Sequence, residues 1–167
     1  MLTILSETEK LLPSLLMKPD VWTGLYVDYH HPYVERLWTQ LGENRISLHK
    51  IYPCKVGEAL FHPHPWPQAV KILKGEYEMG VGYGENHQKS PPIASTLMLK
   101  ADTTYEMTDP DGWHYVRPLT EPSYSIMVTG KPWQEKNKSE EKLRLRTLTR
   151  SEKEDLLNTF KEFYNLE

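Results

Sequence analysis

Apolar and polar side chains alternate with a period of two through the middle of the chain, from Arg45 to Gly130. Such alternation is typical of strands that have one buried and one exposed face. Turn residues separate the alternating stretches, and the strongest turn signals are Lys74-Gly75 and Asp109-Pro110-Asp111-Gly112. The pattern therefore predicts strands over residues 45–51, 70–74, 77–83, 95–100, 104–107, 113–117 and 124–129.

Three other stretches have the spacing of amphipathic helices. The first is leucine-rich, ends near Leu16 and follows Ser6 and Glu9, which have capping-box spacing. The second begins at Pro32, with Glu35, Arg36 and Gln40 outside and an apolar face of Val34, Leu37, Trp38 and Leu41. The third is a C-terminal helix that follows Ser151 and Glu154, a second capping-box pair, and its apolar stripe is Leu156, Leu157, Phe160 and Phe163.

Short strands between terminal helices predict a mainly β fold, an antiparallel double-stranded β-helix or jelly-roll barrel. The chain has 167 residues, which suits one domain. We expect an N-terminal helical segment over residues 1–44, a β-barrel core over residues 45–130, and a charged linker with the C-terminal helix over residues 131–167. Homodimers are common among jelly-roll proteins, and the C-terminal stripe is one surface that a homodimer would use.

Charge and composition narrow the expected partners. The formal net charge is −3, which implies no basic face, so we expect no nucleic-acid partner. No apolar run approaches the ~20 residues that span a bilayer, and the first residues lack the pattern of a secretion signal, so no membrane partner is expected. Cys54 is the single cysteine and excludes an internal disulfide. A cytoplasmic protein fits these features.

The stretch from Gly57 to Gly75, GEALFHPHPWPQAVKILKG, carries the candidate chemistry. His62 and His64 are two residues apart, so in an extended chain both imidazoles point to the same side. Gln68 follows with an amide oxygen, and His114 comes just after the second turn. Three imidazoles and a side-chain oxygen predict an open site for a divalent metal, with His62, His64, Gln68 and His114 as ligands.

Each of these residues also has a simpler interpretation. Three prolines alternate with His62, His64 and Trp66. A proline-stiffened loop whose histidines only form hydrogen bonds would have the same sequence. The neighbouring His30 and His31 are interpreted as residues at the start of the second helix and not as a ligand pair. His49 is a lone strand histidine, interpreted as a core or interface residue more readily than as part of the site.

These motifs resemble those of the cupin superfamily. Its first motif is matched by Gly57, His62, His64, Gln68 and Gly75, and its second by Pro110, Gly112 and His114. The resemblance covers residues 45–130, about half of the chain. Gly57 stands one residue closer to the histidines than is usual, and His114 follows Gly112 after one residue instead of two. Pro118 stands where the family has asparagine, and Gln68 stands where it most often has glutamate.

The replacement of glutamate by Gln68 has chemical consequences. Three neutral imidazoles and a neutral amide leave a divalent ion its full charge, which glutamate would halve. Such an ion should be a stronger Lewis acid, favour an anionic ligand and be held less tightly.

The resemblance implies a metal-dependent enzyme that acts on a small organic molecule. A dioxygenase is favoured, with Fe2+ as the metal, although imidazole ligands also admit Zn2+, Ni2+, Mn2+ or Cu2+. A cupin isomerase or decarboxylase, and a cupin that binds a small ligand or a metal without turnover, remain alternatives. Tyr77, Tyr105, Glu106 and Arg117 are the candidates for the substrate pocket.

Overall fold

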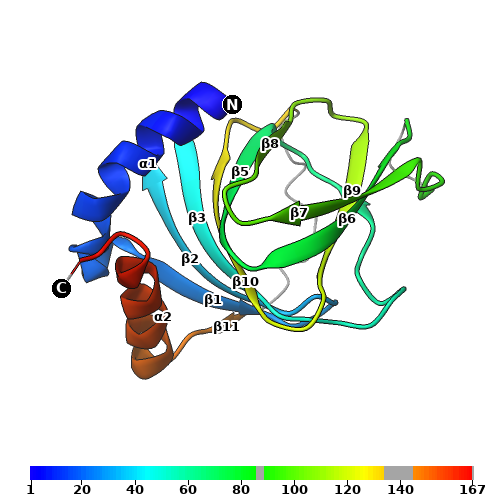
Figure 1. Ribbon diagram of the computed structural model, residues 1–167. Helices are drawn as coiled ribbons and strands as arrows, with labels where there is room; N and C mark the ends of the chain where they lie inside the picture. The colour runs from blue at the N-terminus through cyan, green and yellow to red at the C-terminus, as the bar shows by residue number, and fades with distance from the viewer. Residues whose placement is uncertain (86–88, 134–144, 167) are drawn as a thin grey trace.

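A computed structural model describes residues 1–85, 89–133 and 145–166 of the chain. In this part of the chain the strands form two antiparallel sheets, and both long helices lie on the same side of the larger sheet (Figure 1). The larger sheet has the strand order β11-β1-β2-β3-β10-β5-β8, and the smaller has the order β4-β9-β6-β7. The two sheets are joined by turns at which consecutive strands change sheet, as in a jelly roll. One such turn is Gly75, whose φ of +83° suits glycine.

The larger sheet consists of β1 (Thr23–Val27), β2 (Val34–Leu41), β3 (Asn44–Ile51), β5 (Gln68–Lys74), β8 (Thr104–Met107), β10 (Ser123–Thr129) and β11 (Arg146–Thr147). The smaller sheet consists of β4 (His62–Pro63), β6 (Glu76–Tyr83), β7 (Ser95–Lys100) and β9 (Gly112–Pro118). The helices are α1 (Leu2–Leu16), the 3-10 turn η1 (Pro19–Val21) and α2 (Arg150–Glu162).

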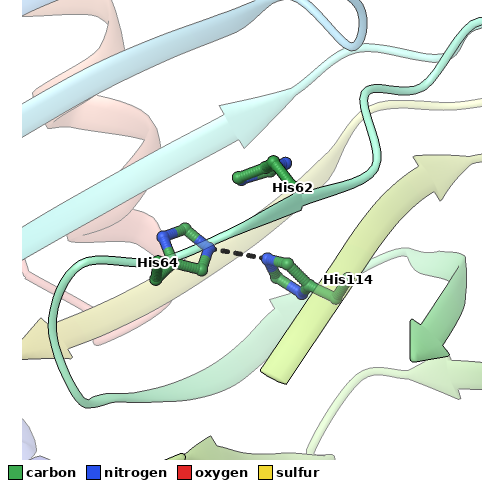
Figure 2. A group of neighbouring side chains, drawn as sticks. All are labelled: His62, His64 and His114. Atoms are coloured by element: carbon green, nitrogen blue, oxygen red, sulfur yellow. Dashed lines mark hydrogen bonds between the residues drawn. The ribbon is translucent and has the colours of Figure 1, made fainter. Parts of the chain in front are cut away.

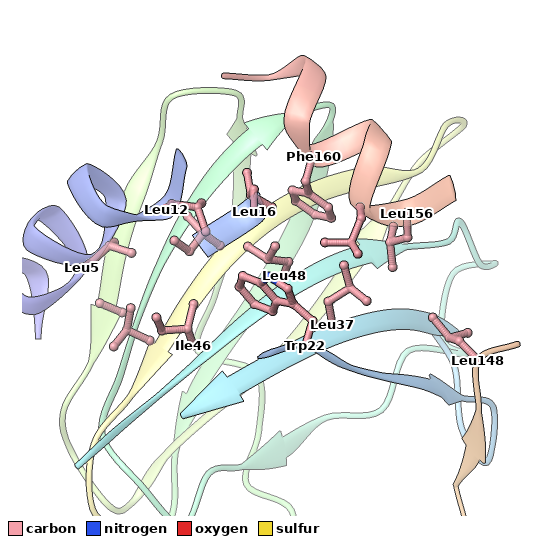
Figure 3. Close-up of a cluster of buried hydrophobic side chains, with 14 residues drawn as sticks. Leu5, Leu12, Leu16, Trp22, Leu37, Ile46, Leu48, Leu148, Leu156 and Phe160 are labelled. Carbon is pink, nitrogen blue, oxygen red and sulfur yellow. The ribbon is translucent and has the colours of Figure 1, made fainter. Parts of the chain in front are cut away.

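The main hydrophobic core lies between the helices and the larger sheet (Figure 3). The helices contribute buried leucines and one aromatic ring: Leu5, Leu12, Leu16, Leu156, Leu157 and Phe160. The sheet contributes one face of each central strand: Leu37, Ile46, Leu48, Ala69, Ile126 and Val128. Because side chains alternate along a strand, the opposite face of the same strands is turned toward the smaller sheet. This second face positions the candidate site.

The predicted fold class is confirmed as a mainly antiparallel β fold of jelly-roll type with an N-terminal and a C-terminal helix. The described strands form two sheets, however, and not the closed barrel that was expected. Every strand predicted between residues 45 and 130 is present, with ends shifted by at most a few residues. The helices of the described residues include none that is long and apolar enough to cross a membrane.

The helix predicted over residues 32–41 is wrong, because this stretch is strand β2. Its apolar residues fit a helical stripe by coincidence, since β2 is covered on both faces. Leu37 is buried against the helices, while Val34 and Arg36 lie on the other face and line a cavity. The residues before it form β1 and not only a loop, so the strands already begin at Thr23, outside the expected core of residues 45–130.

Both predicted helix starts are also wrong. The first helix starts at Leu2, with no side-chain cap, and Ser6 lies inside it. The C-terminal helix is capped by Thr149, whose Oγ1 accepts a hydrogen bond from the Glu152 amide while the Glu152 carboxylate accepts one from the Thr149 amide. A capping box is therefore present two residues before the expected one.

The apolar stripe of α2 packs on the larger sheet of its own chain. It is therefore not the surface on which a homodimer would form, and the homodimer stays a prediction. Residues 134–144, which make up most of the expected charged linker, lie outside the described part of the chain.

Candidate metal centre

The three predicted histidine ligands come together at one end of the smaller sheet. Strand β4 pairs with β9 so that His62 and His114 are direct neighbours in the register, and His64 follows just after β4. The nearest ring nitrogens of His62, His64 and His114 all lie within 4.8 Å of one another. Figure 2 shows the three imidazoles around a common space. The two strands thus bring together residues that are 50 positions apart in the sequence.

The imidazole rings form a nearly regular triangle. Their centroids are 4.7 Å apart for His62 and His64, 4.8 Å for His64 and His114, and 5.2 Å for His62 and His114. The Nε2 atoms of His64 and His114 face each other at 2.7 Å (Figure 2). In neutral rings, one of these atoms donates a proton and the other accepts it. Two nitrogen lone pairs would point to the same place if that proton were replaced by a metal ion.

The third histidine is oriented by the backbone. Nδ1 of His62 lies 2.9 Å from the carbonyl oxygen of Leu60. A carbonyl only accepts hydrogen bonds, so this Nδ1 carries the proton and the lone pair is on Nε2. A histidine whose second nitrogen donates to a carbonyl is the usual arrangement of a metal ligand, because the bond fixes both the tautomer and the ring orientation.

The surroundings keep the imidazoles neutral. Burial, followed by the charge of His62, lowers the pKa of His114 to about 3. Burial and the neighbouring His114 and His62 hold the pKa of His64 well below its usual value, and burial also lowers that of His62. Neutral imidazole is the form that binds metals.

Gln68 is fully buried at the start of β5 and lines the same cavity as the three histidines. Its Nε2 donates to Sδ of Met107 at 3.6 Å, and its Oε1 has no partner among the described residues. A buried oxygen without a partner is costly, and a metal ion would satisfy it. Three neutral nitrogens and one amide oxygen therefore fit a divalent cation of intermediate hardness.

The cluster opens on a cavity of about 300 Å³ between the two sheets. The larger sheet contributes His49, Ser125, Met127 and Val70 to the wall, and the smaller sheet contributes Tyr77 and Val116. This volume is at the lower end of the range for ligand pockets, which is about 300–1,000 Å³. The cavity suits a small organic molecule.

The four predicted pocket residues divide into two pairs. Tyr77 and Tyr105 line the cavity, and their hydroxyl oxygens lie 2.9 Å apart. Glu106 and Arg117 are not among the lining residues. Each follows a lining residue in its strand, Tyr105 or Val116, and so points to the opposite face. Instead, the Glu106 carboxylate pairs with the N-terminal amine, and Arg117 pairs with Glu78.

Two other histidines line the cavity although we interpreted them otherwise. His49 is 7% exposed, and its Nε2 has no partner in the described part of the chain. His30 lies in the connection from β1 to β2, with its ring 6.1 Å from that of His62. Neither His30 nor His31 starts a helix, since a strand follows them. The ring of His31 stacks on Tyr33.

Arg36 is a charged residue of the cavity wall that the sequence interpretation missed. It was placed outside because a helix was expected. The signal that would have found it is the alternation of Val34, Arg36 and Trp38 read with a period of two. Burial, together with the charge of Arg45, lowers the pKa of Arg36 to about 10. Burial holds the pKa of His49 well below its usual value, and the charge of Arg36 lowers it further. The same charge adds a smaller effect to the burial and neighbouring imidazoles that lower the pKa of His64.

No family model matches the chain, and no curated protein matches it. Solved structures do. Hydroxypropylphosphonic acid epoxidase from S. wedmorenis is 17% identical with a TM-score of 0.51, over 66% of this chain and 56% of the other. A structure of Fe(II)-HppE with the alternative substrate (S)-1-HPP is 16% identical with a TM-score of 0.52, over 66% and 57%. AerE from Microcystis aeruginosa is 17% identical with a TM-score of 0.49, over 78% and 55%.

The first two of these neighbours have the cupin fold, and the chain spans little more than half of their length. At this level of identity the similarity establishes the fold and leaves the reaction open. The strand order, the histidine cluster on the smaller sheet and the structural neighbours agree with the resemblance found in the sequence motifs. The chain is a cupin-fold protein.

Proposed function

We propose that this protein binds one divalent metal through His62, His64 and His114, with Gln68 as the fourth ligand, and that it is a metal-dependent enzyme acting on a small organic molecule. The observation that carries the proposal is the convergence of three neutral imidazoles on one point beside a cavity. The buried Gln68 oxygen that lacks a described partner supports the fourth ligand. A structural zinc site would be closed by four strong ligands, whereas this donor set is open to the cavity.

Fe2+ is the favoured metal, and a dioxygenase-like reaction is the favoured activity. A structural neighbour is described as Fe(II)-HppE with a bound alternative substrate, which supports an iron site on this fold. When bound, the ion would supply Lewis acidity and free positions for substrate and O2. The chain's own residues would hold the ion and shield it from bulk water. Their apolar neighbours Val116 and Met127 would orient the substrate.

Metal titration of variants tests the ligand set. His64→Ala should lower the affinity for Fe2+ or Zn2+ at least tenfold, because the weak fourth ligand cannot compensate for a lost imidazole. Gln68→Glu should raise the affinity, because it adds a negative charge beside the cation. His31→Ala is the matched control, since His31 is not a lining residue of the cavity, and it should bind as the parent does.

The proposal fails in separate ways. If His64→Ala binds the metal as tightly as the parent, the ligands are elsewhere. If only Gln68→Glu behaves like the parent, the three histidines stand and Gln68 is not a ligand. O2 consumption by the Fe2+-loaded protein with small organic acids then separates a dioxygenase from a cupin that binds without turnover.

A further inference from the structure

Arg36 brings a positive charge into the cavity that holds the histidine cluster. It lies in the middle of β2, directly opposite His49 of β3 in the register, and it lines the cavity together with His62 and His64. The arginine and the proposed metal ligands thus line one cavity. Arg36 and Gln68 lie on the larger sheet, and His62 and His114 lie on the smaller one.

The guanidinium of Arg36 pairs with no carboxylate among the described residues, and only the phenol of Tyr29 favours its charge. Its Nε is buried without a hydrogen-bond partner, and none of the described ion pairs includes it. The charge that acts on it most strongly is another arginine, Arg45. By contrast, Arg117 pairs with Glu78. Arg36 is half-buried, and its buried Nε has lost hydration without gaining a hydrogen bond, which is costly for a charged group.

The cavity wall does not supply the missing anion. No aspartate or glutamate is among its lining residues in the described part of the chain. The other polar groups there are imidazoles, hydroxyls, the indole of Trp66 and the amide of Gln68. A divalent ion on three imidazoles would add two more positive charges. A ligand with at least one negative group would therefore be the natural complement of this space.

The apolar part of the cavity wall indicates what the uncharged part of the ligand is. Val34, Ile51, Val70, Val116 and Met127 all line the cavity, so most of its sides are apolar. Apolar walls favour the binding of a hydrocarbon group, because both the group and the walls lose apolar surface that was exposed to water. A ligand that satisfies both parts of the cavity has an oxyanion at one end and a short apolar chain.

We propose that Arg36 binds the oxyanion of a small organic acid, which lies against the apolar walls and contacts the ion held by the histidines. This substrate class rests on the proposed function for the metal contact only, since the pairing with Arg36 needs no metal. The planar guanidinium forms paired hydrogen bonds with a carboxylate or with a phosphonate. The shared chemistry is thus an oxyanion on an apolar body.

The experiment measures the binding of three probes: butyrate, propylphosphonate and the uncharged 1-butanol. Each has a chain of four non-hydrogen atoms that ends in its oxygen atoms. Calorimetry is carried out on the full-length parent, Arg36→Met, Arg36→Gln and the control Arg117→Met, each metal-free and loaded with Zn2+. At least one anion should bind the parent, and both Arg36 variants should bind it about 10- to 100-fold more weakly. 1-Butanol should not discriminate among the proteins, and Arg117→Met should behave as the parent.

The outcomes are distinct. The anion that binds the parent more tightly identifies the headgroup. The proposal is overturned if both Arg36 variants bind the anions as tightly as the parent, or if neither anion binds the parent better than 1-butanol. Titration of the same proteins with Zn2+ tests the proposed metal site separately. If the parent does not bind Zn2+ but its anion binding still depends on Arg36, the metal proposal fails and the anion site stands.

Discussion

Replacing Arg36 with methionine should stabilise the protein when no ligand is present. The pKa of this arginine falls from 12.5 to about 10 on folding, chiefly because burial disfavours its charge. At 1.36 kcal/mol per pKa unit, the charge costs the folded state about 3 kcal/mol. Below pH 10 the group is charged in both the folded and the unfolded state, so this cost applies at neutral pH.

Methionine removes the charge and keeps much of the side-chain volume. Some packing of the arginine stem is lost, so we expect the free energy of unfolding to rise by about 1–3 kcal/mol. For a domain of this size each kcal/mol raises the melting temperature by about 2–4 °C. The assay is urea unfolding followed by tryptophan fluorescence, in a metal-free buffer without carboxylate or phosphate. The midpoint should rise with an unchanged slope.

Two variants control this experiment. Arg36→Lys keeps a buried positive charge and should not be stabilised. Arg117→Met removes an arginine that is paired with Glu78, and its free energy of unfolding should stay the same or fall. If Arg36→Met lowers the free energy of unfolding by more than about 1 kcal/mol, the guanidinium makes a stabilising interaction within the protein, and the reasoning about an unpaired charge is refuted.

Three further predictions concern the fold. Gly75→Ala should cost about 1–3 kcal/mol in urea unfolding, because φ is +83° there and a Cβ would lie 3.0 Å from the Pro122 carbonyl oxygen; an unchanged midpoint would contradict this. Phe160→Ala should cost about 3–5 kcal/mol, because the ring is fully buried, and a loss below about 1 kcal/mol would mean that the core is placed wrongly. Burial raises the pKa of Tyr105 to about 12, so the unfolded chain releases this proton first and stability should fall between pH 10 and 12. Tyr105→Phe should make that fall shallower, and an identical pH dependence would disprove the assignment.

The strands with one covered and one open face were predictable from the sequence, because burial on one side imposes the period of two. Strand β6 is an example. Strand β2 was not predictable in this way. Both of its faces are covered, so its apolar residues need not alternate, and by chance they fit a helix. The start of α1 was missed because burial of Leu5 against the sheet, and not a capping side chain, sets its first turn.

Part of the histidine cluster could be foreseen because the placement of His62 and His64 is local: residues of the same parity in an extended chain point the same way. His114 is placed by the long-range pairing of β9 with β4, and only the motif resemblance indicated it. The opposite wall could not be foreseen, since it depends on how two sheets face each other. Arg36 and His49 enter the cavity only through that packing. The alternation of Val34, Arg36 and Trp38 could have placed Arg36 on a strand face, but it does not tell what that face packs against.

X-ray absorption spectroscopy of the metal-loaded protein tests the central claim most directly. With one equivalent of Fe2+ or Zn2+ bound to tag-free protein, the spectrum should show three imidazole nitrogens at ~2.0–2.2 Å, and His64→Ala should show two. A spectrum without imidazole scattering, or one that is the same in His64→Ala, would contradict the claim that His62, His64 and His114 hold the metal.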